Sequence, residues 1–193
     1  MTLVSEDRKV FGKYHDIAIL LLGFILTTIV GGYLSHSWQD RSAKIQRDAE
    51  QKRYEIQAAT KVFEDISRLM DKRLYRMRRV NMGIDNKVDS EVMDGRWNAY
   101  KEILFEWNEN LNRNLALTQM YFGKESRDIL ERDIQSRFIT FGRLMESSRN
   151  IKGKNNTYEK RQQVADDLNN YIYDFDLMLI RNIQNGSIGS YMK

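Results

Sequence analysis

The chain contains neither cysteine nor proline. Without cysteine it has no disulfide bond, no thiolate nucleophile and no cysteine-ligated metal. Without proline it lacks the strongest helix breaker, which favours a protein built of long helices. Its 193 residues carry 31 basic and 27 acidic side chains, and the resulting net charge of +4 is too small to be typical of a dedicated nucleic-acid-binding protein.

Histidine is scarce, because the only two are His15 and His36. Both flank an apolar run, and we interpret them as interfacial residues. The chain beyond His36 therefore has no histidine general base and no carboxylate–histidine pair of the kind that binds di-iron centres in helical bundles. P-loop, GxGxxG and GxSxG motifs are also absent. We expect no enzyme activity, no cofactor and no metal ion.

Acidic residues are densest near the C-terminus, at Asp166, Asp167, Asp174 and Asp176. An all-carboxylate site is one interpretation of this cluster. Acidic residues on a helix more often form a solvated face, and we favour that interpretation here.

The longest uncharged stretch, residues 17–34, has 18 residues and is predominantly apolar. At a helical rise of ~1.5 Å per residue, this length spans a hydrocarbon core about 30 Å thick. It exceeds the ~7–15-residue apolar region of a cleavable signal peptide. The sequence therefore predicts one uncleaved transmembrane helix over residues 17–36.

Basic residues on the two sides of this helix predict its orientation. Three precede it, namely Arg8, Lys9 and Lys13. Five follow it within the window of about twenty residues that influences orientation. These five are Arg41, Lys44, Arg47, Lys52 and Arg53. The excess predicts that the C-terminal part lies in the cytoplasm.

Apolar residues after residue 38 recur at steps of three and four, which is the spacing of one helix stripe. The first stripe runs to residue 82, a second helix is expected from about residue 91 or 94 to 122, a third from 124 or 126 to 150, and a fourth after the loop 151–156. Gly83, Gly123 and Asn185-Gly186 are placed where helices end. The residues expected to face inward on the last three helices are Trp97, Tyr100, Leu104, Trp107, Leu111, Leu115, Thr118, Phe122, Leu130, Ile134, Phe138, Phe141, Met145, Val164, Leu168, Tyr171, Phe175, Met178 and Ile183.

This pattern predicts an all-α protein in which one N-terminal transmembrane helix continues into an antiparallel four-helix bundle. We divide the chain into a polar leader (1–16), the transmembrane helix (17–36), a helical stalk (37–55), the bundle domain (56–186) and a tail (187–193).

A basic stretch on the first helix is one candidate site. Arg68, Lys72, Arg76 and Arg79 fall on one helix face, which is typical of a surface that binds phosphates, anionic lipid or an acidic partner. Three acids, Glu64, Asp65 and Asp71, dilute this charge, and we favour the simpler interpretation of a solvated helix face.

Two further candidates concern helix packing. Asn108 and Asn114 lie nearest the apolar stripe of the second helix, where buried amides can fix helix register, and we expect a polar core cluster with Arg73. If Arg73 is buried it needs a carboxylate, for which the candidates are Glu102, Glu106 and Glu109. Small residues four apart at Gly23, Thr27 and Gly31 are typical of a transmembrane association face.

Two segments, KVFEDISRLMDKRLYRMRR (61–79) and LFEWNENLNRNLALTQMYFG (104–123), follow the apolar span DIAILLLGFILTTIVGG. Together they resemble a group of uncharacterised bacterial proteins with one N-terminal membrane helix and a helical soluble domain. The resemblance covers roughly the first two thirds of the chain. It implies a bacterial inner-membrane protein and brings no known activity, so it transfers no functional residue.

We therefore expect a membrane-anchored helical interaction or sensory module whose partners are the lipid bilayer and either another protein or a second copy. An alternative is a small oligomeric membrane effector of a defence or toxin type, assembled through the glycine face. A third, less favoured hypothesis is a membrane-tethered nucleic-acid-binding domain that uses the basic stripe.

Overall fold

The computed structural model describes residues 4–150 and 158–192, and these residues form helices without any strand. The elements are α1 (Val4–Asp85), α2 (Ser90–Asp128), a π-helical turn η1 (Ile129–Ile134), α3 (Gln135–Asn150), α4 (Tyr158–Asn185) and a 3-10 turn η2 (Gly189–Tyr191). The predicted all-α class is confirmed. The chain divides into two compact units, Met1–Lys52 and Arg53–Lys193.

The first unit consists of the N-terminal part of α1, which is long and apolar enough to cross a membrane. Its large apolar side chains from Ile19 to Leu34 are all exposed, from 49% at Val30 to 77% at Tyr33. Ile45, which continues the apolar period of the sequence, is also 70% exposed. Residues 19–52, the part of this unit whose side chains are described, are therefore all exposed and bury no apolar core of their own.

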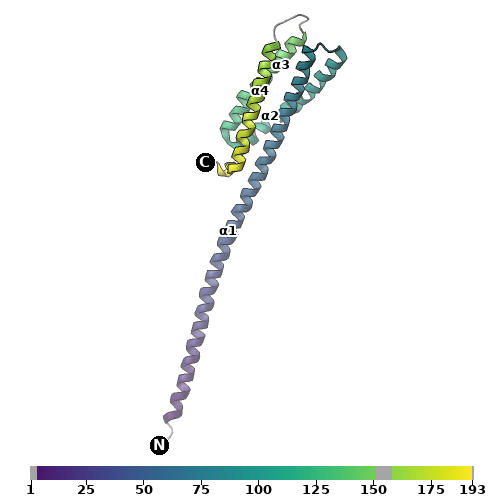
Figure 1. Cartoon of the computed structure of the whole chain (residues 1–193). Helices are drawn as coiled ribbons and strands as arrows, with labels where there is room; N and C mark the ends of the chain where they lie inside the picture. Colours follow the sequence, from purple (N-terminus) through teal and green to yellow (C-terminus); the bar gives the residue numbers. More distant parts are fainter. Residues whose placement is uncertain (1–3, 151–157, 193) are drawn as a thin grey trace. The chain divides into compact units, whose positions relative to one another are not determined.

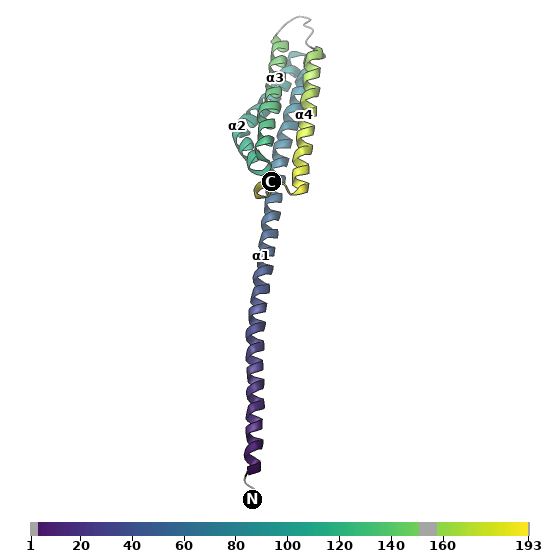
Figure 2. The same cartoon turned by 90° about the vertical axis from the view of Figure 1, so that its left-hand side faces the viewer.

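The second unit has a single hydrophobic core, to which the C-terminal part of α1, α2, η1, α3 and α4 all contribute. Figures 1 and 2 show α2, α3 and α4 alongside this part of α1. The inward positions predicted around η1 and α3 are confirmed, since all five side chains are fully buried. These five are Leu130, Ile134, Phe138, Phe141 and Met145.

The predicted stripe on α4 is wrong at Tyr171, which is 40% exposed, whereas Ile172 is only 3% exposed. Successive helical residues are separated by about 100°, so a stripe read from spacing alone can be displaced by one residue. The buried face of α4 also includes Arg161 and Leu179, which the predicted stripe omits.

The connection between α1 and α2 is shorter than the sequence predicts. Gly83 does not end α1, which continues to Asp85. Gly83 is buried, and it packs closely against α2, since an added Cβ would lie 2.9 Å from Cε of Met93. Asp89 caps α2 by accepting a hydrogen bond from the backbone N–H of Val92 at 2.9 Å. An Asp at this position satisfies an otherwise unpaired helix N–H group.

Gly123, predicted to end the second helix, does break the helical geometry: the range of α2 comprises two helical segments joined by a kink at this residue. Its backbone angles, φ 86° and ψ 172°, are non-helical, and the helix continues to Asp128. This region of backbone space is essentially restricted to glycine. The predicted start of a third helix near residues 124–126 coincides with the helical segment after this kink, which is followed directly by η1 and α3. The predicted loop 151–156 lies outside the described residues.

The predicted tail also contributes to the second unit. Ile188 is fully buried in the core, and the backbone N–H and hydroxyl of Ser190 donate to the two carboxylate oxygens of Glu55, at 2.9 and 2.6 Å. The segment after Gly186 is therefore fastened to α1.

We predict that Gly123→Ala lowers the free energy of unfolding by about 1–3 kcal/mol, because alanine cannot adopt the backbone angles of the kink without strain. The matched variant is Gly95→Ala, in the same helix, where an added Cβ meets no atom within 4 Å. This variant should be more stable by about 0.5–1 kcal/mol. Urea titration of the full chain in detergent, followed by circular dichroism, measures both. Equal effects of the same sign would contradict the kink.

Candidate functional site

The basic stripe predicted on α1 is partly neutralised, because two of its four residues form ion pairs with carboxylates. Arg68 pairs with Asp65 at 3.2 Å, and Lys72 pairs with Glu106 of α2 at 3.0 Å. These pairs are solvent-exposed and add little stability, but they neutralise part of the stripe. Arg76 lies 5.8 Å from the ring centroid of Tyr75, and Arg79 is exposed.

The predicted polar core is only partly correct. Arg73 and Asn114 are buried, with 2% and 1% of their areas exposed. Asn108 is exposed, so its predicted place in the core is wrong: it directly follows Trp107, whose side chain takes the inward position. Among the described residues, no hydrogen bond joins Asn114 to Arg73, and the buried Nδ2 of Asn114 has no partner.

Arg73 reaches across the core to groups on other helices. Its Nη1 donates to Oε1 of Gln135 at 3.3 Å, and the same oxygen accepts a hydrogen bond from Nε1 of Trp107 at 2.7 Å. Its guanidinium carbon lies 4.3 Å from the ring centroid of Phe138 and 5.4 Å from that of Trp107. Cation–π contacts of this kind stabilise a desolvated guanidinium.

No carboxylate of the described residues forms an ion pair with Arg73. The expected partners Glu102, Glu106 and Glu109 are wrong, and Glu106 pairs with Lys72 instead. Burial lowers the pKa of Arg73 to about 10, while the nearby Tyr100 acts in the opposite direction. Arg73 therefore remains charged at neutral pH, and its buried Nε has no hydrogen-bond partner among the described residues.

Arg161 shows how the same core accommodates a second buried arginine, which is 4% exposed. Its Nε donates to Oδ1 of Asn81 at 2.6 Å and its Nη1 to Oγ of Ser148 at 2.8 Å. Its Nη2 forms an ion pair with Asp85. Arg161 thus has a carboxylate and two further acceptors, whereas Arg73 has no carboxylate.

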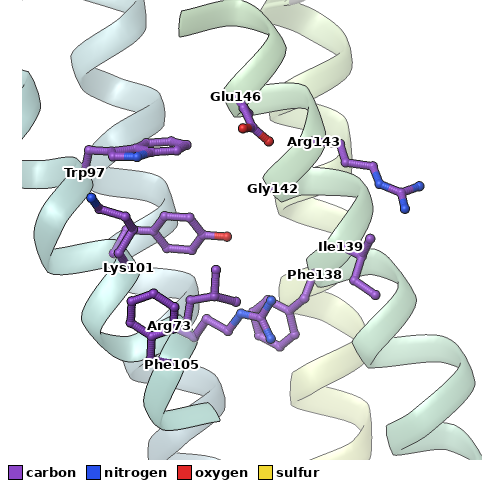
Figure 3. A pocket seen from close by; sticks show the side chains of 11 residues that line it. Arg73, Trp97, Lys101, Phe105, Phe138, Ile139, Gly142, Arg143 and Glu146 are labelled. Carbon is purple, nitrogen blue, oxygen red and sulfur yellow. The ribbon is translucent and has the colours of Figure 1, made fainter. Parts of the chain in front are cut away.

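A pocket of about 390 Å³ opens beside Arg73, between α2 and α3. Figure 3 shows Trp97 and Phe105 on one side and Phe138 on the other, with the Arg73 guanidinium next to the Phe138 ring. Lys101 and Arg143 also line the pocket but point away from each other, outward from its centre. Glu146 lines the end of the pocket near Trp97, away from Arg73.

Two residues were not identified from the sequence: Gly142, which lines the pocket, and Gln135, which accepts the hydrogen bond of Arg73. Gly142 lets the hydroxyl of Tyr100 approach α3, since an added Cβ would lie 3.1 Å from this oxygen. A glycine inside a predicted helix was the available signal, because it costs stability and usually has a packing reason. Gln135 has no such signal: it immediately follows the π-helical turn, a feature often found near functional sites.

The predicted solvated acidic face is wrong at Asp176, which is partly buried. Its Oδ2 accepts a hydrogen bond from Oγ of Ser67 at 2.7 Å, and its buried Oδ1 has no partner among the described residues. Burial raises the pKa of Asp176 to about 6, the Ser67 hydrogen bond opposes this, and the charge of Asp71 raises it further. No group of metal-ligating residues occurs in the part of the chain that is described.

The predicted association face lies in the first unit, and nothing described covers it. An added Cβ at Gly23 or Gly31 would meet no atom within 4 Å. The Thr27 hydroxyl donates to the carbonyl oxygen of Gly23 at 2.7 Å, so its hydrogen bond is satisfied within α1. A satisfied hydroxyl is compatible with a lipid environment.

Comparison with known proteins gives no match: no protein family, no curated protein and no solved structure is significantly similar to this chain.

We predict that Asp85→Asn lowers the free energy of unfolding by about 3–5 kcal/mol, because it leaves the buried Arg161 without a counter-charge. The matched control is Glu106→Gln, which removes the carboxylate of the exposed Lys72 pair and should change stability by less than about 1 kcal/mol. Urea unfolding of the full chain measures the difference. An equal effect of both variants would show that Arg161 does not depend on Asp85.

Stability should also depend on the protonation of Asp176. Its folded-state pKa of about 6 lies above 3.8, the ordinary pKa of an aspartate, so the folded state binds the proton more tightly than the unfolded state. This contribution is fully present below pH 3.8 and is lost as the pH rises through about 6. We expect Asp176→Asn to raise the melting temperature at pH 7 and to remove much of the decline between pH 4 and pH 7.

The matched control for this titration is Asp174→Asn, an exposed acid on the same helix. It should leave the pH dependence of the melting temperature unchanged. Two results together would contradict the role of burial at Asp176: a wild-type melting temperature that rises from pH 4 to pH 7, and the same pH dependence in Asp176→Asn.

Proposed function

We propose that this protein is a membrane-anchored helical interaction or sensory module of the bacterial inner membrane. The observation that carries this proposal is the exposed apolar run of α1, Ile19 to Leu34, which no described part of the chain covers. Burying such a run in a bilayer removes its apolar area from water. Anchoring restricts the second unit to a thin layer and raises its effective concentration for membrane partners.

We further propose that the second unit belongs to the antiparallel four-helix bundles. The support is a set of contacts in which residue numbers rise along one helix while they fall along its neighbour. These contacts are Ser67–Asp176 and Asn81–Arg161 for α1 and α4, Lys72–Glu106 and Arg79–Arg96 for α1 and α2, Trp107–Gln135 and Asp94–Arg149 for α2 and α3, and Arg137–Tyr171 and Ser148–Arg161 for α3 and α4.

Binding rather than catalysis is the proposed mode of action. The sequence beyond His36 has no histidine and no cysteine. It therefore lacks the residue that most often acts as a general base and the most nucleophilic side chain that enzymes use. We propose a cytoplasmic location for the second unit, on the excess of five basic residues after the apolar run over three before it.

A second candidate function is an oligomeric membrane effector. It is supported by Gly23 and Gly31, around which the described chain leaves open space. Glycines at such positions allow a second membrane helix to approach closely. Nucleic-acid binding has less support, because Arg68 and Lys72 are already paired with carboxylates.

Membrane fractionation tests the anchor. We expect the full chain to remain in the membrane pellet after an alkaline carbonate wash, with a cytoplasmic C-terminus that makes a fluorescent-protein fusion bright and an alkaline phosphatase fusion inactive. The double variant Leu22→Arg and Ile29→Arg should shift the chain to the soluble fraction, since each arginine at the centre of a membrane helix costs about 2.5–3.5 kcal/mol.

The matched control for fractionation is Ile45→Arg, an equally exposed apolar residue outside the run. This variant should stay in the pellet. Wild-type protein in the soluble fraction, or release by Ile45→Arg as complete as by the double variant, would contradict the anchor. The reverse pair of fusion activities would place the second unit outside the cytoplasm.

A further inference from the structure

We propose that the pocket between α2 and α3 binds a small organic carboxylate with a flat apolar body, and that Arg73 is its anion-binding residue. This inference goes beyond the proposed membrane anchor and does not depend on it, because every pocket residue belongs to the second unit.

The first argument is the charge of Arg73. Removing a guanidinium from water is costly unless acceptors replace the lost hydration, and buried charges in proteins are normally paired. Arg161 follows this rule, with a carboxylate and two other acceptors from neighbouring helices. Arg73 has the amide oxygen of Gln135, the neighbouring Tyr100 and two aromatic faces, but no carboxylate among the described residues. A bound anion would complete its surroundings.

The second argument is the position of Arg73. It is the residue from α1 that lines the pocket, and its guanidinium lies at the end of the pocket opposite Glu146 (Figure 3). A planar guanidinium binds a carboxylate through two parallel hydrogen bonds, which a lysine cannot do. The anion is therefore expected at the Arg73 end, where repulsion from Glu146 is weakest.

The third argument is the size and composition of the pocket. Its volume of about 390 Å³ lies in the range of small-molecule sites, which are mostly apolar with a few polar groups that orient the ligand. Trp97, Phe105 and Phe138 provide aromatic surface, and the hydroxyl of Tyr100 lies near Gly142 of α3, where an added Cβ would be 3.1 Å from this oxygen. Flat rings pack well against such walls. The pocket thus combines one buried cation with an aromatic enclosure.

The charges at the rim favour the same ligand. Lys101 and Arg143 are exposed pocket residues, and together with Arg73 they outnumber the single acid, Glu146. Because both side chains point outward, they raise the positive potential at the opening without occupying the pocket. An anion is attracted to this opening, whereas an organic cation is repelled.

Three fluorinated probes of equal size test the inference: para-fluorophenylpropanoate, the corresponding alcohol and the corresponding amine. Each is titrated by fluorine NMR against the full chain in lipid nanodiscs, with empty nanodiscs as the background. We expect the carboxylate to bind at least about tenfold more tightly than the alcohol, the factor that corresponds to one charge-assisted hydrogen bond, and the amine to bind most weakly.

Two variants assign the site, and a third is the control. Arg73→Met keeps the side-chain length and should reduce carboxylate affinity to that of the alcohol, without weakening the alcohol. Ile139→Trp, a partly exposed lining residue, should weaken the carboxylate and the alcohol alike by filling the pocket. Arg79→Met, an exposed arginine of α1 outside the pocket lining, should change nothing.

Thermal unfolding of each variant shows that a loss of binding does not reflect a loss of fold. If Arg73→Met does not fold, Ile139→Trp still tests the pocket. The inference is overturned if wild-type protein shows no carboxylate binding above the nanodisc background, if the amine or alcohol binds as tightly as the carboxylate, or if folded Arg73→Met or Ile139→Trp binds the carboxylate as wild type does.

Discussion

The hydrogen-bonded ion pair of Arg161 is the constraint on which the packing of the second unit depends most directly. One side chain of α4 binds Asn81 and Asp85 of α1 and Ser148 of α3, and it is almost completely buried. Apolar contacts tolerate small sliding movements, but a buried guanidinium has directional donors that must all find acceptors. The network therefore fixes the axial position of α4 relative to α1 and α3, at the end of the unit where α1 ends. Such a network provides specificity more than net stability, because desolvation offsets much of the attraction.

Arg73 is the exception that gives the core a functional interpretation. It is buried in the same unit, yet its surroundings are two aromatic rings, an amide oxygen and a phenol in place of a carboxylate. A core optimised only for stability would replace this cation with an apolar side chain of similar length. The charged group beside a pocket of about 390 Å³ is a local departure from this rule, and such departures are expected at functional sites. Asp176 is a second group whose charged form is destabilised by burial, as its raised pKa indicates. It lies outside the pocket lining.

Much of the helical organisation could be predicted because it is local in the sequence. The spacing of Leu130, Ile134, Phe138, Phe141 and Met145 predicted five buried side chains correctly, and the glycine at position 123 marked a real break in helical geometry. What failed depends on which helix faces which. Tyr171 and Ile172 are neighbours on α4, and only packing decides which one points inward. The partner of Arg73 proved to be Gln135, 62 residues away, where the sequence suggested a nearby acid on α2. Asp176 was assigned to a solvated face because no local pattern reveals that Ser67 lies opposite it.

One helix, α1, carries both the exposed apolar run of the proposed anchor and the pocket residue Arg73. Among the pocket residues, Arg73 comes from α1, and the others come from α2 and α3. An anion bound there would neutralise a buried cation of the same helix that carries the exposed apolar run. A ligand shifts a conformational equilibrium only by the difference in its affinity for the two states. The Arg73–anion interaction is a suitable source of that difference, because its strength depends on how closely α2 and α3 enclose the charge. In the proposed sensory function, an anion at Arg73 would act on the packing of α2 and α3 against α1, because these are the helices that line the pocket.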